Sequence, residues 1–95
     1  MARVLTPARL AAWRQAMAEA PLRAVDRFVQ SPAWRRSSKG NRTRWWDGQR
    51  VTVYRTEHDT FGWCIAAGDG DRRFSEGDYD TEEEAMESAG MALIL

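Results

Sequence analysis

Cysteine, a strong nucleophile, and histidine, the usual catalytic base, occur only once each in this chain. Cys64 lies between Gly62 and Ala66 in an apolar stretch, and His58 lies in a polar segment. A thiol nucleophile needs a base held beside it, and a buried cysteine without one behaves as a small hydrophobic residue. We therefore predict no catalytic residues and no enzymatic activity. The alternative is a small thiol enzyme, which would require His58 and Cys64 to meet in a pocket.

Metal and cofactor sites also lack their usual patterns. Structural zinc takes about four ligands, whereas the chain has a single cysteine and a single histidine. The acidic turns Asp69-Gly70-Asp71 and Asp78-Tyr79-Asp80 could hold calcium or magnesium weakly, but they lack the distal acid of a calcium loop. The glycines occur singly, without a phosphate-binding or dinucleotide-binding pattern. The sequence predicts neither a metal site nor a cofactor.

One segment, from Trp34 to Arg55, combines cations with aromatic residues. Cations neutralise phosphates and release counterions, while exposed aromatic side chains stack on bases. We predict that this segment binds nucleic acid through Arg35, Arg36, Lys39, Arg42, Arg44, Trp46, Arg50, Tyr54 and Arg55. The structural alternative is that these arginines form a solvated sheet face or pair with an acidic C-terminal helix.

The charges are divided between two parts of the chain, although the net charge is zero. Residues 1–55 contain twelve basic residues and three acids, a balance of +9, and residues 56–95 contain two arginines and eleven acids, a balance of −9. Such asymmetry indicates an electrostatic partner, or halves that attract each other across the fold. The alternative function is therefore a protein-interaction or inhibitor module that uses its acidic half, Asp69 to Glu87, against a basic site on another protein.

Length and composition predict one small folded domain. The 95 residues are 43% hydrophobic and 29% charged, which is typical of a globular protein with a single core. Because Cys64 is alone, no intramolecular disulfide can form, and we expect a reducing, cytoplasmic location. No apolar run approaches the roughly 18 residues of a membrane span, so we expect no membrane association. The oligomeric state stays open.

Hydrophobic spacing and turn residues divide the chain into four segments. Thr6-Pro7 is a favourable helix start, and apolar residues then recur at three- and four-residue intervals up to a break or kink near Pro21. Thr81 and the three glutamates after it form a capping box for a last helix. The predicted segments are 1–30 helical, 31–41 a basic loop anchored by Trp34, 42–75 a β-meander and 81–95 the C-terminal helix.

The hairpin at Asp47-Gly48 determines which arginines share a sheet face. A two-residue loop would place Arg44 opposite Val51, whereas an odd number of loop residues would separate apolar from charged side chains. We therefore expect the odd loop. The two faces would then hold Thr43, Trp45, Val51 and Val53 on one side, and Arg42, Arg44, Arg50, Thr52 and Tyr54 on the other.

These segments predict an α+β fold, with an N-terminal helix broken near Pro21, a three- to four-stranded antiparallel meander sheet, and a C-terminal helix packed on one sheet face. The expected core is Leu10, Trp13, Phe28, Val51, Val53, Trp63, Ile65, Phe74, Met86 and Leu93. If the other face is uncovered, it should form a shallow basic groove that combines Arg42, Arg44, Arg50 and Tyr54 with the small residues Gly62, Cys64 and Ala66.

Two families share parts of this predicted order. A helix, three strands and a helix resembles the double-stranded-RNA-binding domain, but that family has basic residues where this chain has Glu82, Glu83 and Glu84. The stretch from Arg42 to Leu93 resembles the arm-binding modules of phage-type integrases, which use their sheet on DNA. That resemblance rests on strand order and the helix start Thr-Glu-Glu-Glu-Ala, without a specific motif. The residues do not indicate membership in either family.

Overall fold

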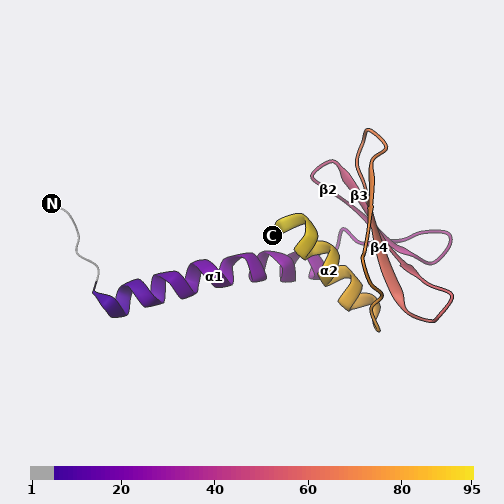
Figure 1. Ribbon diagram of the computed structural model, residues 1–95. Helices are drawn as coiled ribbons and strands as arrows, with labels where there is room; N and C mark the ends of the chain where they lie inside the picture. The colour runs from indigo at the N-terminus through magenta and orange to yellow at the C-terminus, as the bar shows by residue number, and fades with distance from the viewer. Residues whose placement is uncertain (1–5) are drawn as a thin grey trace.

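The computed structural model describes residues 6–95, except for the side chains of Trp13 and residues 16–18 (Figure 1). The first five residues of the predicted helical segment lie outside the described residues. The elements are α1 (Pro7–Gln30), β1 (Arg35–Arg36), β2 (Arg42–Trp46), β3 (Gln49–Arg55), β4 (Phe61–Ala66), β5 (Arg72–Phe74) and α2 (Glu82–Ile94). The predicted α+β fold is confirmed, with one strand more than expected.

The N-terminal helix begins where the sequence predicts. The Thr6 hydroxyl accepts a hydrogen bond from the Arg9 N–H, and Pro7 occupies the first turn, where its missing N–H is not needed. The helix continues through Pro21, so the expected break does not interrupt α1. A proline removes one helical hydrogen bond while the turns on either side keep theirs, which lets a long helix bend without ending.

The sheet is an antiparallel meander in the order β1-β2-β3-β4-β5. β1 falls within the segment predicted as a loop, because Arg35 pairs with Thr43 and Arg36 with Arg42 beyond a tight turn. That turn closes through a hydrogen bond from the Ser37 N–H to the Asn41 carbonyl. The basic loop is therefore in part a short edge strand.

The hairpin between β2 and β3 has a strictly two-residue loop, so the expectation of an odd loop is wrong. Asp47 and Gly48 both have positive φ, 48° and 75°, as in the turn type whose twist matches that of the flanking strands. Arg44 consequently lies opposite Val51, and Arg42 lies opposite Val53. The turn geometry therefore fixes the register. It places arginines on the apolar face, where other side chains and a backbone carbonyl bind them.

Both helices lie on one side of the sheet (Figure 1). α2 packs against β3 and β4, and the C-terminal part of α1 packs against α2. The buried core is Val25, Phe28, Trp34, Val51, Val53, Trp63, Ile65, Ala85, Met86 and Ala89. Trp34 is thus the anchor that the sequence indicates.

Some residues of the expected core lie elsewhere. Phe74 is 58% exposed, because it pairs with Cys64 on the open side of the sheet, so its prediction as a core residue is wrong. Leu10 and Leu93 are half-buried, and the side chain of Trp13 lies outside the described residues. The core lies mainly between α2 and strands β3 and β4, with Val25 and Phe28 added from the last turns of α1. The first half of α1 projects from the rest of the molecule (Figure 1).

α2 begins as the capping box predicts, with the Thr81 hydroxyl accepting from the Glu84 N–H. Further along, Gly90 lets α2 approach α1 closely, since a Cβ at this position would lie 2.8 Å from Phe28 Cδ1 and 3.3 Å from Val25 Cγ1. Neither helix has the combination of length and hydrophobicity needed to cross a membrane, within the described residues.

The contact at Gly90 gives a stability prediction. Gly90→Val should lower the free energy of unfolding by about 1–3 kcal/mol, because the added side chain overpacks the junction between the helices. Urea denaturation measures the change. Gly77→Val serves as the control, since a Cβ there meets no atom within 4 Å. Equal stability of the two variants would contradict the close packing of α1 on α2.

Candidate nucleic-acid interface

The predicted nucleic-acid residues divide between the two faces of the sheet. The two-residue hairpin turns Arg42, Arg44 and Trp46 toward the helices together with Val51 and Val53. On the helix side lie Arg36, Arg42, Arg44, Trp46 and Arg55. On the open side lie Arg35, Arg50 and Tyr54, and Lys39 lines the same hollow from the β1–β2 turn.

Two arginines of the helix side bind one carboxylate at the start of α2. Arg36 donates from Nη1 and Nη2 to Glu82 Oε2 and Oε1 at 3.1 and 3.0 Å, and Arg42 donates from Nε to Oε1 at 3.0 Å. Partial burial raises the pKa of Glu82, but the hydrogen bonds and charges of Arg36 and Arg42 outweigh it and hold the pKa below its ordinary value. These arginines therefore tie β1 and β2 to α2.

Arg44 holds the end of α1. Its Nη1 donates to the Phe28 carbonyl at 2.9 Å, and its guanidinium lies 4.7 Å from the Phe28 ring centroid and 5.8 Å from the Trp34 ring centroid. Trp34 Nε1 donates to the same carbonyl at 2.9 Å. Burial lowers the pKa of Arg44, which still stays protonated at neutral pH. Arg44 is thus a structural cation.

Two further predicted residues have structural contacts. Arg55 forms an ion pair with Asp59 in the turn after β3. Trp46 is half-buried, packs against the core and meets the Phe28 ring edge-to-face at 6.4 Å between centroids. The contacts on the helix side therefore support the structural alternative, in which these arginines maintain the fold. Two of them, Arg36 and Arg42, pair with the acidic helix α2.

The open side carries a different set of residues, arranged in rows across neighbouring strands. Cross-strand pairing sets two rows side by side. The first row is Trp45, Arg50, Ala66 and Arg72, and the second is Arg35, Thr43, Thr52, Cys64 and Phe74. Neither row contains an acid.

A hollow of about 430 Å³ lies over these rows. Its floor includes Cys64 and Ala66, and cations stand around it at Lys39, Arg50 and Arg72. The predicted shallow groove is therefore present without Arg42 and Arg44, which lie on the other face. The small side chains at its centre leave room, and the long side chains at its border supply charge.

The Tyr54 side chain lies flat against the open face of the sheet because its cross-strand partner is a glycine. A Cβ at Gly62 would fall 2.9 Å from the Tyr54 hydroxyl and 3.0 Å from its Cζ. The aromatic ring thus covers the backbone of Gly62, which is buried. The glycine lets a flat aromatic surface form beside the hollow.

Three open-side residues were not predicted as site residues: Trp45, Arg72 and Phe74. Trp45 is 65% exposed and Phe74 58% exposed. The signal that would have found Phe74 is the alternation along β4, since it pairs with Cys64 on the small-residue side. Trp45 could be assigned to the open face only with the correct hairpin register, because the odd loop would have placed it on the face of Val51 and Val53.

The residues considered for catalysis and metal binding do not come together. His58 is exposed in the turn after β3, with Nε2 3.6 Å from Glu57 Oε1, and does not line the hollow that contains Cys64. Within the part of the chain that the structure describes, no three histidine, cysteine or acidic side chains are grouped as metal ligands. The cations and aromatic residues of the open side remain the candidate site.

The lowered pKa of Glu82 gives a pH-dependent prediction. The carboxylate stabilises the fold fully above its ordinary pKa, and this contribution is lost as the pH falls through the depressed pKa of the folded state. Glu82→Gln should lower the free energy of unfolding at pH 7 by about 1 kcal/mol, since all three side chains are partly exposed. The difference from the unmodified protein should vanish in acid. Glu84→Gln, in the same helical turn, should show a smaller change at pH 7.

Arg44 and Arg50 form a matched pair for a second stability prediction. Arg44→Gln should cost about 1–2 kcal/mol, because it removes one donor to the Phe28 carbonyl and the cation over the Phe28 ring. Arg50→Gln should leave stability nearly unchanged, because Arg50 is exposed on the open side. Thermal and urea unfolding measure both. A larger loss at Arg50 would contradict the division of the two faces.

Comparison with protein-family models, with curated proteins and with solved structures found no match. The function is therefore inferred from the chain's own residues and their geometry.

Proposed function

We propose that this chain is a non-enzymatic binding module that engages single-stranded nucleic acid through the open face of its sheet. The observation that carries the proposal is the composition of that face. Its strand positions carry Arg35, Arg50 and Arg72 without an acid, and Trp45 and Phe74 are exposed among them. We further propose a cytoplasmic location, since the lone Cys64 suits a reducing compartment.

The cations of the open face are available to phosphate. Arg35, Lys39, Arg50 and Arg72 are all exposed. Arg50 makes one long hydrogen bond, 3.4 Å from its Nε to the Thr43 hydroxyl on the same face, and no carboxylate neutralises it among residues 6–95. Binding of phosphates by such side chains releases counterions, which supplies affinity that falls with salt.

The aromatic residues favour a single strand over a duplex. Trp45 lies on β2 and Phe74 on β5, three strand spacings apart, or about 14 Å. Tyr54 lies flat over Gly62 on the same face. Bases can stack on such side chains only when they are not already stacked in a helix, so a splayed single strand fits this surface.

One observation favours the alternative function as well. On the helix side, Asp26, Glu83 and Glu87 line a groove between α1 and α2, and all three are exposed. This acidic groove suits a basic protein surface. This groove is separate from the open face, so one chain can bind nucleic acid through the sheet and a basic protein through the groove.

Fluorescence anisotropy with labelled single-stranded DNA, single-stranded RNA and duplex DNA tests the proposal at about 50 and about 200 mM salt. Single strands should bind at low salt and weaken at high salt. The double variant R50Q/R72Q should weaken binding and reduce the slope of log affinity against log salt by about 1.4, because two phosphate contacts are lost. Trp45→Ala should weaken binding about tenfold with the slope unchanged.

Arg23→Gln provides the control, since it removes one positive charge from α1, away from the open face. It should leave affinity within about twofold. Absence of single-strand binding at low salt would overturn the proposal, and so would equal affinities of all variants. Preference for the duplex would contradict the stacking of bases on Trp45 and Phe74.

A further inference from the structure

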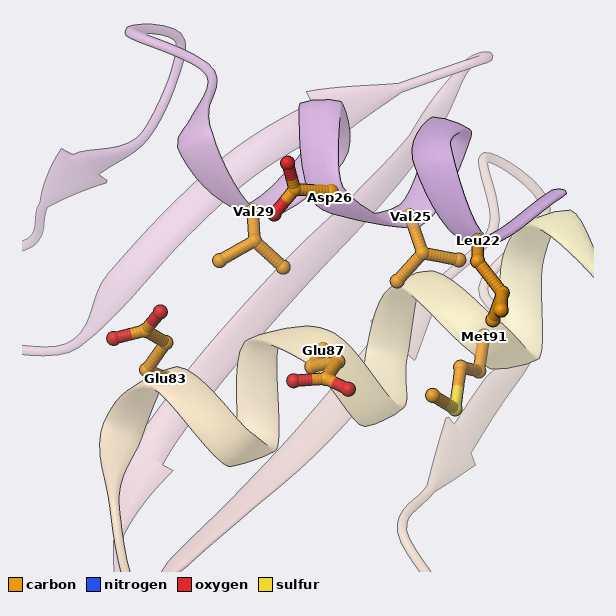
Figure 2. A pocket seen from close by; sticks show the side chains of 7 residues that line it. All are labelled: Leu22, Val25, Asp26, Val29, Glu83, Glu87 and Met91. Atoms are coloured by element: carbon orange, nitrogen blue, oxygen red, sulfur yellow. The ribbon is translucent and has the colours of Figure 1, made fainter. Parts of the chain in front are cut away.

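The groove between the two helices has an apolar floor that is open to solvent. Figure 2 shows Leu22, Val25 and Val29 of α1 facing α2, and Met91 extending from α2 below Leu22. The groove has a volume of about 290 Å³. Leu22 is 55% exposed and Met91 36% exposed at its end. An exposed apolar groove of this kind marks an interaction site.

Three carboxylates flank this apolar floor. Asp26 comes from α1, and Glu83 and Glu87 come from successive turns of α2 (Figure 2). Among the ion pairs of residues 6–95, none involves these acids. An occupant of the groove should therefore be apolar along its centre and basic at its margins.

The first half of α1 has this composition. Residues 7–18 contain Arg9 and Arg14 and no acid, and Leu10, Trp13 and Met17 recur in the sequence at helical spacing. This half of the helix projects from the body of the molecule (Figure 1). The radius of gyration of 17.3 Å exceeds the roughly 12 Å of a compact chain of this length.

We propose that the occupant is a second copy of this chain. The first half of α1 of one copy lies in the acidic groove of the other, with the two α1 helices antiparallel about a two-fold axis. Each copy supplies one basic helix and one acidic groove, so the contact is reciprocal and closes as a dimer. The inference goes beyond nucleic-acid binding and gives the acidic half a definite partner.

The exposed area is sufficient for such a dimer. The chain exposes 7149 Å², whereas a compact monomer of 10.9 kDa exposes roughly 5600 Å². The excess, about 1500 Å² per copy, reflects the elongated shape of the chain, and a standard interface would bury roughly 800 Å² of exposed surface per partner. Burial of the projecting helix in a neighbouring groove would remove much of this excess.

Other occupants fit the groove less well. Its volume lies at the lower limit of small-molecule pockets, about 300 Å³, and it offers only carboxylates as charged groups. The acidic margin would also repel an anionic membrane surface. A basic helix satisfies both the apolar floor and the carboxylates.

Sedimentation velocity on the full chain tests the proposal across about 1–100 μM protein. A species of twice 10.9 kDa is expected at low salt, with weaker association at high salt. Leu22→Glu should raise the dissociation constant about tenfold or more, because it places a charge in the interface. Phe74→Glu is the matched control, since it changes an equally exposed apolar residue on the open face and should leave the dimer intact.

A charge exchange identifies the partner. R9E/R14E gives an acidic helix with an acidic groove, and E83R/E87R gives a basic helix with a groove in which two arginines outnumber Asp26, so each variant alone should be monomeric. An equimolar mixture should restore the dimer, because each helix then meets a groove of opposite charge. Circular dichroism confirms that both variants fold.

Three results would overturn the dimer: a monomer at about 100 μM unmodified protein, undiminished association of Leu22→Glu, or failure of the folded variants to associate when mixed. Loss of the dimer in Phe74→Glu in place of Leu22→Glu would assign the contact to the open face. None of these results depends on nucleic-acid binding, which the anisotropy titrations measure separately.

Discussion

The carbonyl of Phe28, near the end of α1, joins the helical layer to the sheet. It accepts one hydrogen bond from the Trp34 indole and one from the Arg44 guanidinium, both at 2.9 Å. The same two side chains pack against the Phe28 ring, Trp34 edge-to-face and Arg44 over its face. Because the last turn of a helix leaves carbonyls without helical partners, this junction both caps α1 and sets where the chain enters β1. This junction holds the end of α1 on the side of the sheet that α2 covers through β3 and β4.

That placement separates two uses of arginine in one small domain. On the helix side, Arg42 and Arg44 are held by a carboxylate and a carbonyl, so their charges maintain the fold. On the open side, Arg50 and Arg72 border a hollow with small residues at its floor. Neighbouring arginines fall on opposite faces at Arg35–Arg36 and at Arg72–Arg73, because successive side chains of a strand point to opposite sides. A basic segment is therefore not equivalent to a basic surface.

The fold class, the meander over 42–75 and the last helix could be predicted from local signals, because capping residues, turn dipeptides and hydrophobic spacing act over a few residues. The register of the β2–β3 hairpin could not, because binary patterning favoured an odd loop. The backbone twist of the two-residue turn at Asp47-Gly48 determines the register instead. Arg42 and Arg44 therefore face the helices, where Glu82 and the Phe28 carbonyl bind them. The candidate site was likewise predicted only in part, because the register decides which side chains lie on the open face. Arg50 and Tyr54 follow from β3, whereas Trp45 and Phe74 needed the register and the pairing of β5.

The two-residue hairpin also makes this domain sensitive to changes in length. One residue inserted at the Asp47-Gly48 turn would exchange the two faces of β2, since successive side chains point to opposite sides. Arg42 and Arg44 would move to the open face, and Thr43 and Trp45 would move under α2. A single insertion would thus remove the cap of α1 and enlarge the cationic surface in one step. The contacts at the helix junction therefore disfavour a longer loop at this turn.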